Sequence, residues 1–210
     1  MGYAVKEIYF TLQGEGAHTG RAAVFCRFAG CNLWSGLEKH RHKAVCTFCD
    51  TDFIGTDGPG GGKFKTAQDL ASRVHAIWDA EATSGPAYVV FTGGEPLLQL
   101  DADLVEACHG ESLELAIETN GTLKAPAGID WICVSPKADA ELTQRSGQEL
   151  KLVFPQDECC PEDFSDLDFE HFFLQPKDGP GRDLHIQQAT AYCMSHPQWR
   201  LSLQTHKLIG

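Results

Sequence analysis

Near its middle the chain reads Tyr88-Val89-Val90-Phe91-Thr92-Gly93-Gly94-Glu95-Pro96, where a continuous apolar run meets a glycine-rich polar turn. A short apolar run without alternation is typical of a strand that is buried on both faces, as in a parallel sheet. The two glycines and the proline then end the strand and begin a loop. The stretch therefore predicts an α/β fold, with a polar turn at the carboxyl end of one of its strands.

Similar apolar runs on both sides of this stretch predict further strands, at 6–12, 21–28, 113–117, 131–134, 150–154, 172–174 and 199–203. Apolar spacing predicts helices at 66–81, 101–110 and 183–195, the first behind a Thr66 cap. The glycine-rich segment 57–62 predicts a flexible loop. The gaps 118–130 and 135–149 leave little room for a helix and its turns. We expect a single domain over residues 1–210, folded as an incomplete TIM-like barrel with some helices missing.

Polar residues follow four of the predicted strands. They are Thr92-Gly93-Gly94-Glu95-Pro96, Glu118-Thr119-Asn120-Gly121, Ser135-Pro136-Lys137 and Gln175-Pro176-Lys177-Asp178. Ligands of parallel α/β sheets bind at the carboxyl ends of the strands. Any one of these segments is also what an ordinary turn looks like, but four in succession predict a binding rim.

Three cysteines form a second pattern, because Cys31 is followed after fourteen residues by Cys46-Thr47-Phe48-Cys49. A 4Fe-4S cluster that only carries electrons takes four thiolates. Three thiolates predict a cluster in which one iron binds an outside ligand, and S-adenosylmethionine is the known ligand of this kind. The alternative is a zinc-binding module that uses His40 or His42 as the fourth ligand. That alternative leaves the predicted rim without a role.

The composition excludes several classes of function. A formal net charge of −12 argues against nucleic acid as a partner, since phosphate binding needs clustered positive charge. The sequence has no apolar run of eighteen residues and no signal-peptide pattern, so we expect a cytoplasmic protein without membrane contact. We expect its nine cysteines to be free of disulfides. The basic run Lys39–Lys43 is either a solvated loop or a docking patch for an acidic, flavodoxin-type electron donor.

Taken together, these motifs resemble the radical S-adenosylmethionine superfamily, although its usual cysteine spacing has three residues where this chain has fourteen. Within the superfamily the chain resembles the family of 7-carboxy-7-deazaguanine synthases. The motifs that carry this likeness span nearly the whole chain: Phe10-Thr11-Leu12-Gln13-Gly14-Glu15-Gly16, Cys49-Asp50-Thr51, Glu118-Thr119-Asn120-Gly121, Ser135-Pro136-Lys137 and Gln175-Pro176.

The resemblance implies a reaction in which one-electron cleavage of S-adenosyl-L-methionine starts hydrogen abstraction from 6-carboxy-5,6,7,8-tetrahydropterin. Ring contraction with loss of ammonia then gives 7-carboxy-7-deazaguanine, an intermediate of queuosine biosynthesis. The chemistry belongs to the cofactors, so no catalytic residue is expected. A glycyl-radical activating enzyme shares the cofactor, but would lack the polar loop Gln13–Gly16 paired with Arg27.

The resemblance also implies ligands, residue by residue. The 4Fe-4S cluster is expected on Cys31, Cys46 and Cys49, and Mg²⁺ on Thr51, whose hydroxyl is otherwise only a cap for the cysteine loop. Substrate contacts are expected from Leu12, Gln13, Gly14, Glu15, Arg27, Thr92 and the terminal carboxylate of Gly210. S-adenosylmethionine is expected on Thr47, Phe48, Cys49, Asp50, Gly94, Glu118, Ser135, Pro136, Lys137, Gln175, Pro176, Lys177 and Asp178.

Two of these expectations have further detail. A guanidinium can hold a carboxylate with two hydrogen bonds, so Arg27 suits the 6-carboxylate of the pterin. At the C-terminus the alternative to a substrate contact is that Leu208 and Ile209 only fill the open flank of the barrel. The resemblance implies a homodimer as well.

Overall fold

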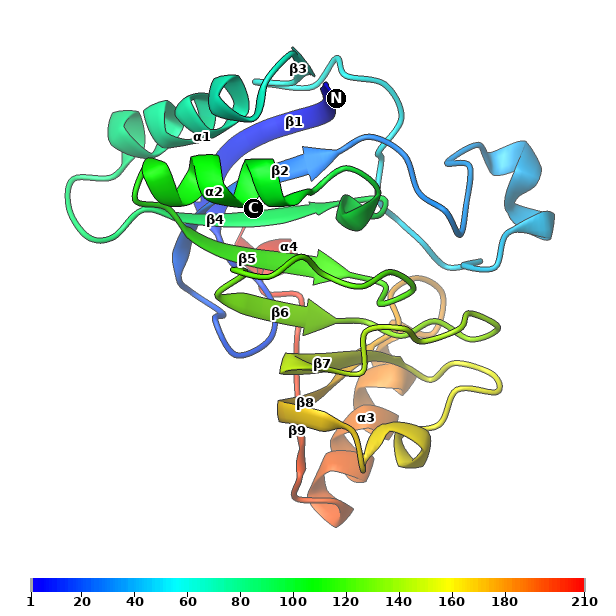
Figure 1. Cartoon of the computed structure of the whole chain (residues 1–210). Helices are drawn as coiled ribbons and strands as arrows, with labels where there is room; N and C mark the ends of the chain where they lie inside the picture. Colours follow the sequence, from blue (N-terminus) through cyan, green and yellow to red (C-terminus); the bar gives the residue numbers. More distant parts are fainter. Residues whose placement is uncertain (1, 210) are drawn as a thin grey trace.

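In residues 2–209, the part of the chain that this computed structural model describes, nine strands form one sheet in the order β3-β1-β2-β4-β5-β6-β7-β8-β9 (Figure 1). The strands are β1 (Tyr3–Leu12), β2 (Ala22–Phe28), β3 (Gly62–Phe64), β4 (Tyr88–Gly93), β5 (Glu114–Thr119), β6 (Trp131–Val134), β7 (Ser146–Phe154), β8 (Asp168–Pro176) and β9 (Trp199–Leu201). All neighbours from β2 to β9 are parallel, and β1 is antiparallel to both β2 and β3. The predicted α/β class with a mostly parallel sheet is confirmed.

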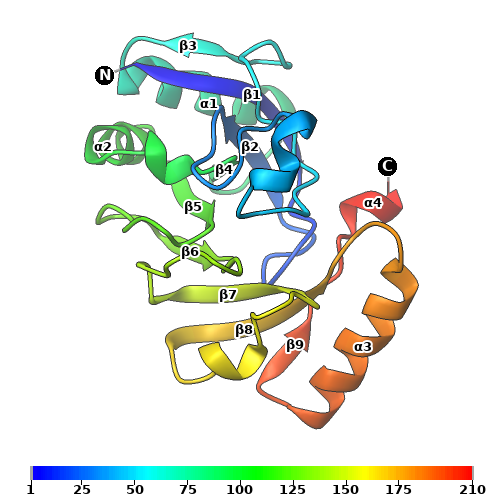
Figure 2. The same ribbon diagram turned by 90° about the vertical axis from the view of Figure 1, so that its right-hand side faces the viewer.

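The sheet is curved, with β3 and β9 at its opposite ends, and the three longer helices lie on its outer side (Figure 2). These helices are α1 (Ala67–Glu81), α2 (Ala102–Gly110) and α3 (Arg182–Ser195). The other helical segments are the terminal α4 (His206–Ile209) and the short 3₁₀ turns η1 (Glu38–Lys43), η2 (Pro96–Leu98) and η3 (Pro161–Phe164). Among the residues described, no helix lies between β5 and β6 or between β6 and β7, as the gap lengths predict. None of these helices has the length and apolar character needed to cross a membrane.

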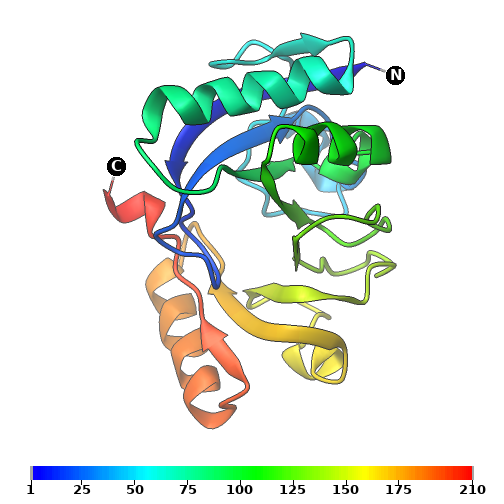
Figure 3. The same cartoon turned by 60° about the vertical axis from the view of Figure 1, so that its left-hand side comes forward.

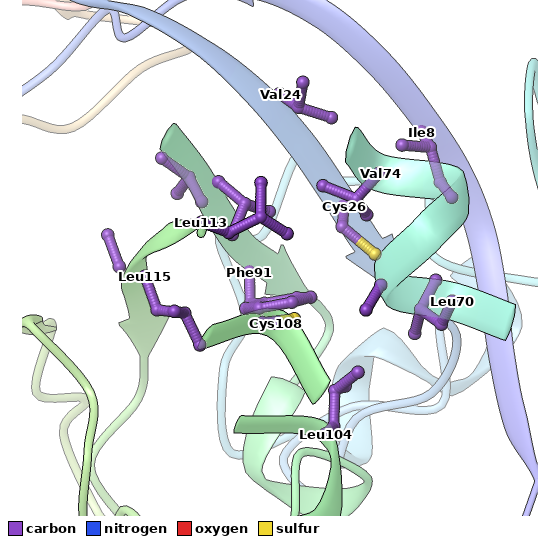
Figure 4. Close-up of a cluster of buried hydrophobic side chains, with 14 of the residues drawn as sticks. Ile8, Val24, Cys26, Leu70, Val74, Phe91, Leu104, Cys108, Leu113 and Leu115 are labelled. Carbon is purple, nitrogen blue, oxygen red and sulfur yellow. The ribbon is translucent and has the colours of Figure 1, made fainter. Parts of the chain in front are cut away.

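The larger core forms where α1 and α2, which lie side by side, cover β1, β2, β4 and β5 (Figure 3). Leu70 and Val74 of α1 meet Phe91 of β4 and Leu104 of α2, all with no exposed surface (Figure 4). Full burial of one such side chain contributes about 1.5–3 kcal/mol. Cys26 of β2 packs in the same cluster as a small apolar residue.

The helix caps follow the sequence closely. Thr66 accepts a hydrogen bond from the Asp69 amide, and the Asp69 side chain accepts one from the Thr66 amide, which completes a capping box at the start of α1. Asp101 caps α2 in the same way through the Leu104 amide. Both predicted helices therefore begin where their polar caps indicate.

The glycine-rich segment 57–62 is not the flexible loop that its composition predicts. Its backbone is docked along β1, with Ile8 N donating to Pro59 O over 2.8 Å and Gly58 N donating to Lys6 O over 2.9 Å. A Cβ atom on Gly61 would lie 2.1 Å from Lys6 O, so glycine is needed because the two backbones are in contact. The segment leads into β3, which covers the edge of β1.

Candidate active site

Two adjoining cavities lie at the concave side of the sheet. The first, of about 210 Å³, is lined by the cysteine loop (residues 31–51) and by the ends of β4, β5, β6 and β8. The second, of about 550 Å³, is lined by β1, β2 and the segments 13–15 and 204–207. Both linings include Glu15, Asp50, Thr51, Thr92, Glu118 and Gln204, so the cavities share a wall.

All four polar turns of the predicted rim reach the first cavity, through Gly94, Asn120, Lys137 and Gln175 among others. The reason is topological. The strands before these turns are parallel, and the carboxyl ends of parallel neighbours meet at one edge of the sheet.

The thiols of Cys31, Cys46 and Cys49 line the same cavity. Hydrogen bonding with Cys46 lowers the pKa of Cys49 to about 6, so one thiol of this set ionises readily. Gly94 packs against this loop, and a Cβ atom there would lie 2.7 Å from Cys31 Cβ and 2.1 Å from Gly30 O. The three cysteines are free thiols, and they surround a cavity beside the glycine turn at Gly94. This donor set fits an iron–sulfur cluster with one open position.

The zinc alternative is not supported by the arrangement of the histidines. His40 lies in the exposed turn η1, where its Nδ1 contacts Ser35 Oγ at 2.9 Å, and His42 is exposed as well. In the described part of the chain, no three His, Cys, Asp or Glu side chains surround a position that one metal ion could occupy. A structural zinc site needs four such ligands around one point.

Glu95 is fully buried and links two turns of the rim, those after β4 and β5, by hydrogen bonds. Its carboxylate accepts hydrogen bonds from Thr119 Oγ1 at 2.7 Å, Asn120 N at 2.8 Å and Leu97 N at 2.9 Å. Asn120 Nδ2 in turn donates to Asn32 Oδ1, next to Cys31, over 3.0 Å. Burial raises the pKa of Glu95 despite these donors. The sequence places Glu95 and Asn120 in the polar turns, but only their contacts show that they join three loops.

Most residues expected to bind S-adenosylmethionine line the first cavity. They are Phe48, Cys49, Asp50, Gly94, Glu118, Ser135, Lys137, Gln175, Pro176 and Asp178. Thr47, Pro136 and Lys177 line neither cavity. Their carbonyl oxygens accept hydrogen bonds from Arg41, Gln156 and His185, respectively. Lys137 is partly buried and donates to Ser135 Oγ over 2.7 Å, and desolvation lowers the pKa of its amine.

The residues expected to bind substrate, Leu12, Gln13, Gly14, Glu15, Arg27 and Thr92, all line the second cavity. Arg27 Nε contacts Glu7 Oε1 at 2.8 Å, and its Nη2 donates to Tyr9 Oη over 3.1 Å. Antiparallel pairing of β1 with β2 places Glu7 directly opposite Arg27.

At the C-terminal end, Gly210 lies outside the described residues. The exposed Leu208 does not fill the flank of the sheet.

Lys151 was missed by sequence reasoning, although a lysine inside the apolar run Leu150–Phe154 is the signal that could have found it. Its Nζ lies 2.7 Å from Glu15 Oε2 and 2.8 Å from Glu118 Oε2, and its side chain is only 4% exposed. Burial opposes ionisation of Glu15, but the charge of Lys151 outweighs it and lowers the pKa of Glu15 to about 2. Glu15, on the wall between the two cavities, is therefore ionised.

Lys207 of α4 was also missed. Its Nζ contacts Asp50 of the cysteine loop at 2.8 Å and Asp178 after β8 at 2.6 Å. At the start of the same segment, Thr205 N donates to Gly14 O over 2.9 Å. The C-terminal segment thus contacts the linings of both cavities.

Similarity to known proteins identifies the family of this chain. No protein-family model matches the chain. It is 66% identical over 212 residues to the 7-carboxy-7-deazaguanine synthase of Caulobacter vibrioides, covering 100% of this chain and 99% of that one. It is 64% identical over 210 residues to that of Bordetella pertussis, with the same coverage. The crystal structure of QueE from Escherichia coli matches with a TM-score of 0.70 at 25% identity, over 98% of this chain and 95% of that chain. The chain therefore belongs to the 7-carboxy-7-deazaguanine synthase family of radical S-adenosylmethionine enzymes.

Proposed function

We propose that this protein converts 6-carboxy-5,6,7,8-tetrahydropterin to 7-carboxy-7-deazaguanine with loss of ammonia, in 7-deazapurine (queuosine) biosynthesis. One observation carries the proposal: the cavity lined by three cysteines shares a wall with a second cavity that holds an arginine and several carboxylates. A radical generated in the first cavity would reach a substrate in the second without crossing solvent. The curved sheet would act as a partial barrel that encloses both.

Cys31, Cys46 and Cys49 would hold the 4Fe-4S cluster, and the turn at Gly94 would face the methionine end of S-adenosylmethionine. Gly94 suits this role because its backbone approaches Gly30 and Cys31 with no room for a side chain. Ser135, Lys137 and Gln175 would meet the ribose, the carboxylate and the adenine edge. When bound, the cluster and S-adenosylmethionine supply the hydrogen-abstracting chemistry, and the protein supplies placement and exclusion of water.

Arg27 would bind the 6-carboxylate of the pterin, at the end of the second cavity formed by β1 and β2. Its guanidinium is already oriented by Glu7 and Tyr9, which lowers the entropy lost when a carboxylate binds. Gln13 and Glu15 would face the amino-pyrimidinone ring, whose N–H groups match carboxylate oxygens. Glu118, expected from the resemblance to contact S-adenosylmethionine, lines both cavities and is proposed to face this ring as well. The terminal carboxylate of Gly210 is proposed to join them.

Thr51 is proposed as the protein ligand of Mg²⁺, with substrate oxygens and water in the remaining positions. Its place on the wall that both cavities share supports this role. The Thr51 hydroxyl also hydrogen-bonds the Cys49 sulfur, which is the contact expected of a simple cap.

An acidic, flavodoxin-type protein is proposed as the electron donor, docking on η1. Arg41 anchors this turn to the cysteine loop, since its guanidinium lies 4.0 Å from the centre of the Trp34 ring and donates to Thr47 O over 3.0 Å. Lys39, His40, His42 and Lys43 remain exposed beside it, a basic patch on a chain of net charge −12. A homodimer and a cytoplasmic location are further proposals that rest on family membership.

The test is anaerobic reconstitution with iron and sulfide, followed by incubation with S-adenosylmethionine, Mg²⁺, dithionite and the carboxylated pterin. We expect 7-carboxy-7-deazaguanine by mass spectrometry. If S-adenosylmethionine is cleaved but the pterin is unchanged, the proposed substrate is wrong.

The proposed role of Gly210 has its own test. Appending a short peptide after Gly210 should weaken pterin binding while the iron content stays constant. Full affinity for the pterin would remove Gly210 from the site.

A further inference from the structure

β7 carries one charged residue, Lys151, inside its apolar second half, Leu150–Phe154. Leu150 and Leu152 point into the second core cluster with no exposed surface, so Lys151 and Val153 face the opposite side of the sheet, towards the first cavity. The Lys151 ammonium is thus held at a fixed depth by the packing of its neighbours. A mobile surface lysine would not be positioned in this way.

The ammonium bridges two carboxylates that come from distant parts of the chain. It contacts Oε2 of both Glu15 and Glu118, while Glu15 Oε1 accepts from Gln204 Nε2 at 3.0 Å and Glu118 Oε1 accepts from Gln13 Nε2 at 3.2 Å. Each carboxylate is therefore held at both oxygens. A carboxylate oxygen can accept more than one hydrogen bond, so each retains acceptor capacity towards the space between the cavities.

The surroundings of Lys151 are strongly charged. Four groups that can carry negative charge face it: Glu15 from the loop after β1, Glu118 from β5, Glu149 from its own strand and Cys133 from β6. Two groups that can carry positive charge lie nearby. Lys137, from the β6–β7 segment, interacts with Lys151, and His206 of α4 interacts with Glu15. Two buried carboxylates that share a site without a cation do not both ionise, because one takes up a proton. Lys151 supplies the cation that keeps Glu15 and Glu118 as paired acceptors.

We propose that Lys151 is a positioning residue that keeps the carboxylates of Glu15 and Glu118 aimed at the N–H donors of the substrate ring. This inference rests on the proposed pterin substrate and deepens it. A wall of two carboxylates accepts hydrogen bonds and cannot donate them, so it selects a ring edge rich in donors, such as that of an amino-pyrimidinone. Without the ammonium, a protonated carboxyl would present a donor to the same edge and weaken binding.

The experiment measures the Kd of 6-carboxy-5,6,7,8-tetrahydropterin by anaerobic calorimetry between pH 6 and 8.5, with S-adenosylmethionine present, for wild type, Lys151→Met and Lys151→Arg. The quantity compared is the ratio of variant to wild-type Kd at each pH, in which titration of the pterin itself cancels. For Lys151→Met we expect a ratio of about ten or more at pH 8, which rises as pH falls because a carboxyl of raised pKa becomes protonated. For Lys151→Arg we expect a smaller ratio that does not change with pH.

If Lys151→Met does not fold, Lys151→Met combined with Glu118→Gln leaves Glu15 as the one carboxylate of the pair, and its ratio should also rise as pH falls. A ratio for either Met variant that is constant with pH would make Lys151 a purely structural residue and overturn the inference. So would a failure of arginine to restore a constant ratio. If wild type itself does not bind the pterin, the proposed function fails instead, and the two failures are distinguishable.

Discussion

Lys207 Nζ lies 2.8 Å from Asp50 Oδ2, although the two residues are 157 positions apart in the sequence. Through this contact and the one with Asp178, the last helical turn links the cysteine loop to the turn after β8. Both aspartates line the first cavity, so the C-terminal segment helps to define the cavity in which we place S-adenosylmethionine.

Replacing Lys207 with methionine should raise the Kd of S-adenosylmethionine about three- to tenfold, because the two loops lose their shared cation. The free energy of unfolding should change by less than about 1 kcal/mol, as is usual for partly exposed ion pairs. Calorimetry at two salt concentrations measures the first quantity and urea unfolding the second. Lys65→Met, at an exposed position that lines neither cavity, is the matched control. Tighter binding in Lys207→Met would mean that Lys207 competes with the ligand.

Alanine at Cys31, Cys46 or Cys49 should abolish both bound iron and cleavage of S-adenosylmethionine, since each thiolate is needed to hold the cluster. Cys193→Ala is the control, because Cys193 is only partly buried and lines neither cavity. Iron analysis and the visible absorption of anaerobically purified protein are the measurements. A full cluster in Cys46→Ala would remove that residue from the ligand set.

Arg27→Ala should weaken binding of the carboxylated pterin roughly tenfold to hundredfold, since loss of a hydrogen bond to a charged group costs about 1.5–3 kcal/mol. Binding of S-adenosylmethionine should change far less. Glu7→Gln keeps the guanidinium but removes its ion pair, so a smaller loss is expected there. Calorimetry with both ligands decides the matter: equal losses for the two would show that Arg27 only stabilises the sheet.

Thr51→Ala should lower turnover and make it less dependent on Mg²⁺, because the variant lacks the hydroxyl that would complete the metal shell. Thr51→Ser keeps the hydroxyl and should behave like wild type. Turnover is followed across a Mg²⁺ titration, with the cluster absorption recorded for each protein. If Thr51→Ala responds to Mg²⁺ as wild type does, the hydroxyl is only a cap for the cysteine loop.

The low pKa of Glu15 makes a prediction about stability and pH. Its folded-state pKa of about 2 lies below the usual value near 4.3, so its pairing stabilises the protein above about pH 4.3 and is lost as pH falls towards 2. In cluster-free protein, Glu15→Gln should lower the free energy of unfolding by about 1–3 kcal/mol at pH 7, and the difference from wild type should shrink below pH 4. Urea unfolding at several pH values measures it, with the exposed Glu141→Gln as control. A difference that is constant with pH would contradict the assigned pKa.

Much of the fold could be predicted from the sequence, because apolar periodicity and polar caps act locally. β6 occupies the predicted range 131–134, and α1 begins behind Thr66. β7 begins at Ser146, four residues before its predicted start. The prediction began too late because Ser146–Glu149 lacks the apolar residues that mark a strand. β3 was missed since glycine-rich sequence predicts a loop unless a neighbouring backbone is known to be in contact with it.

The site divides in the same way. The sequence by itself determined the three thiolates, the polar turns at the strand ends and the glycines beside them, since spacing and residue type carry that information. Only the tertiary structure decided that the cysteine loop and the substrate residues line adjoining cavities, and that Lys151 and Lys207 each bridge two acidic residues. Those bridges join segments between 29 and 157 residues apart. Pairing of charges across such separations depends on which strands become neighbours in the sheet, and no local pattern in the sequence records that.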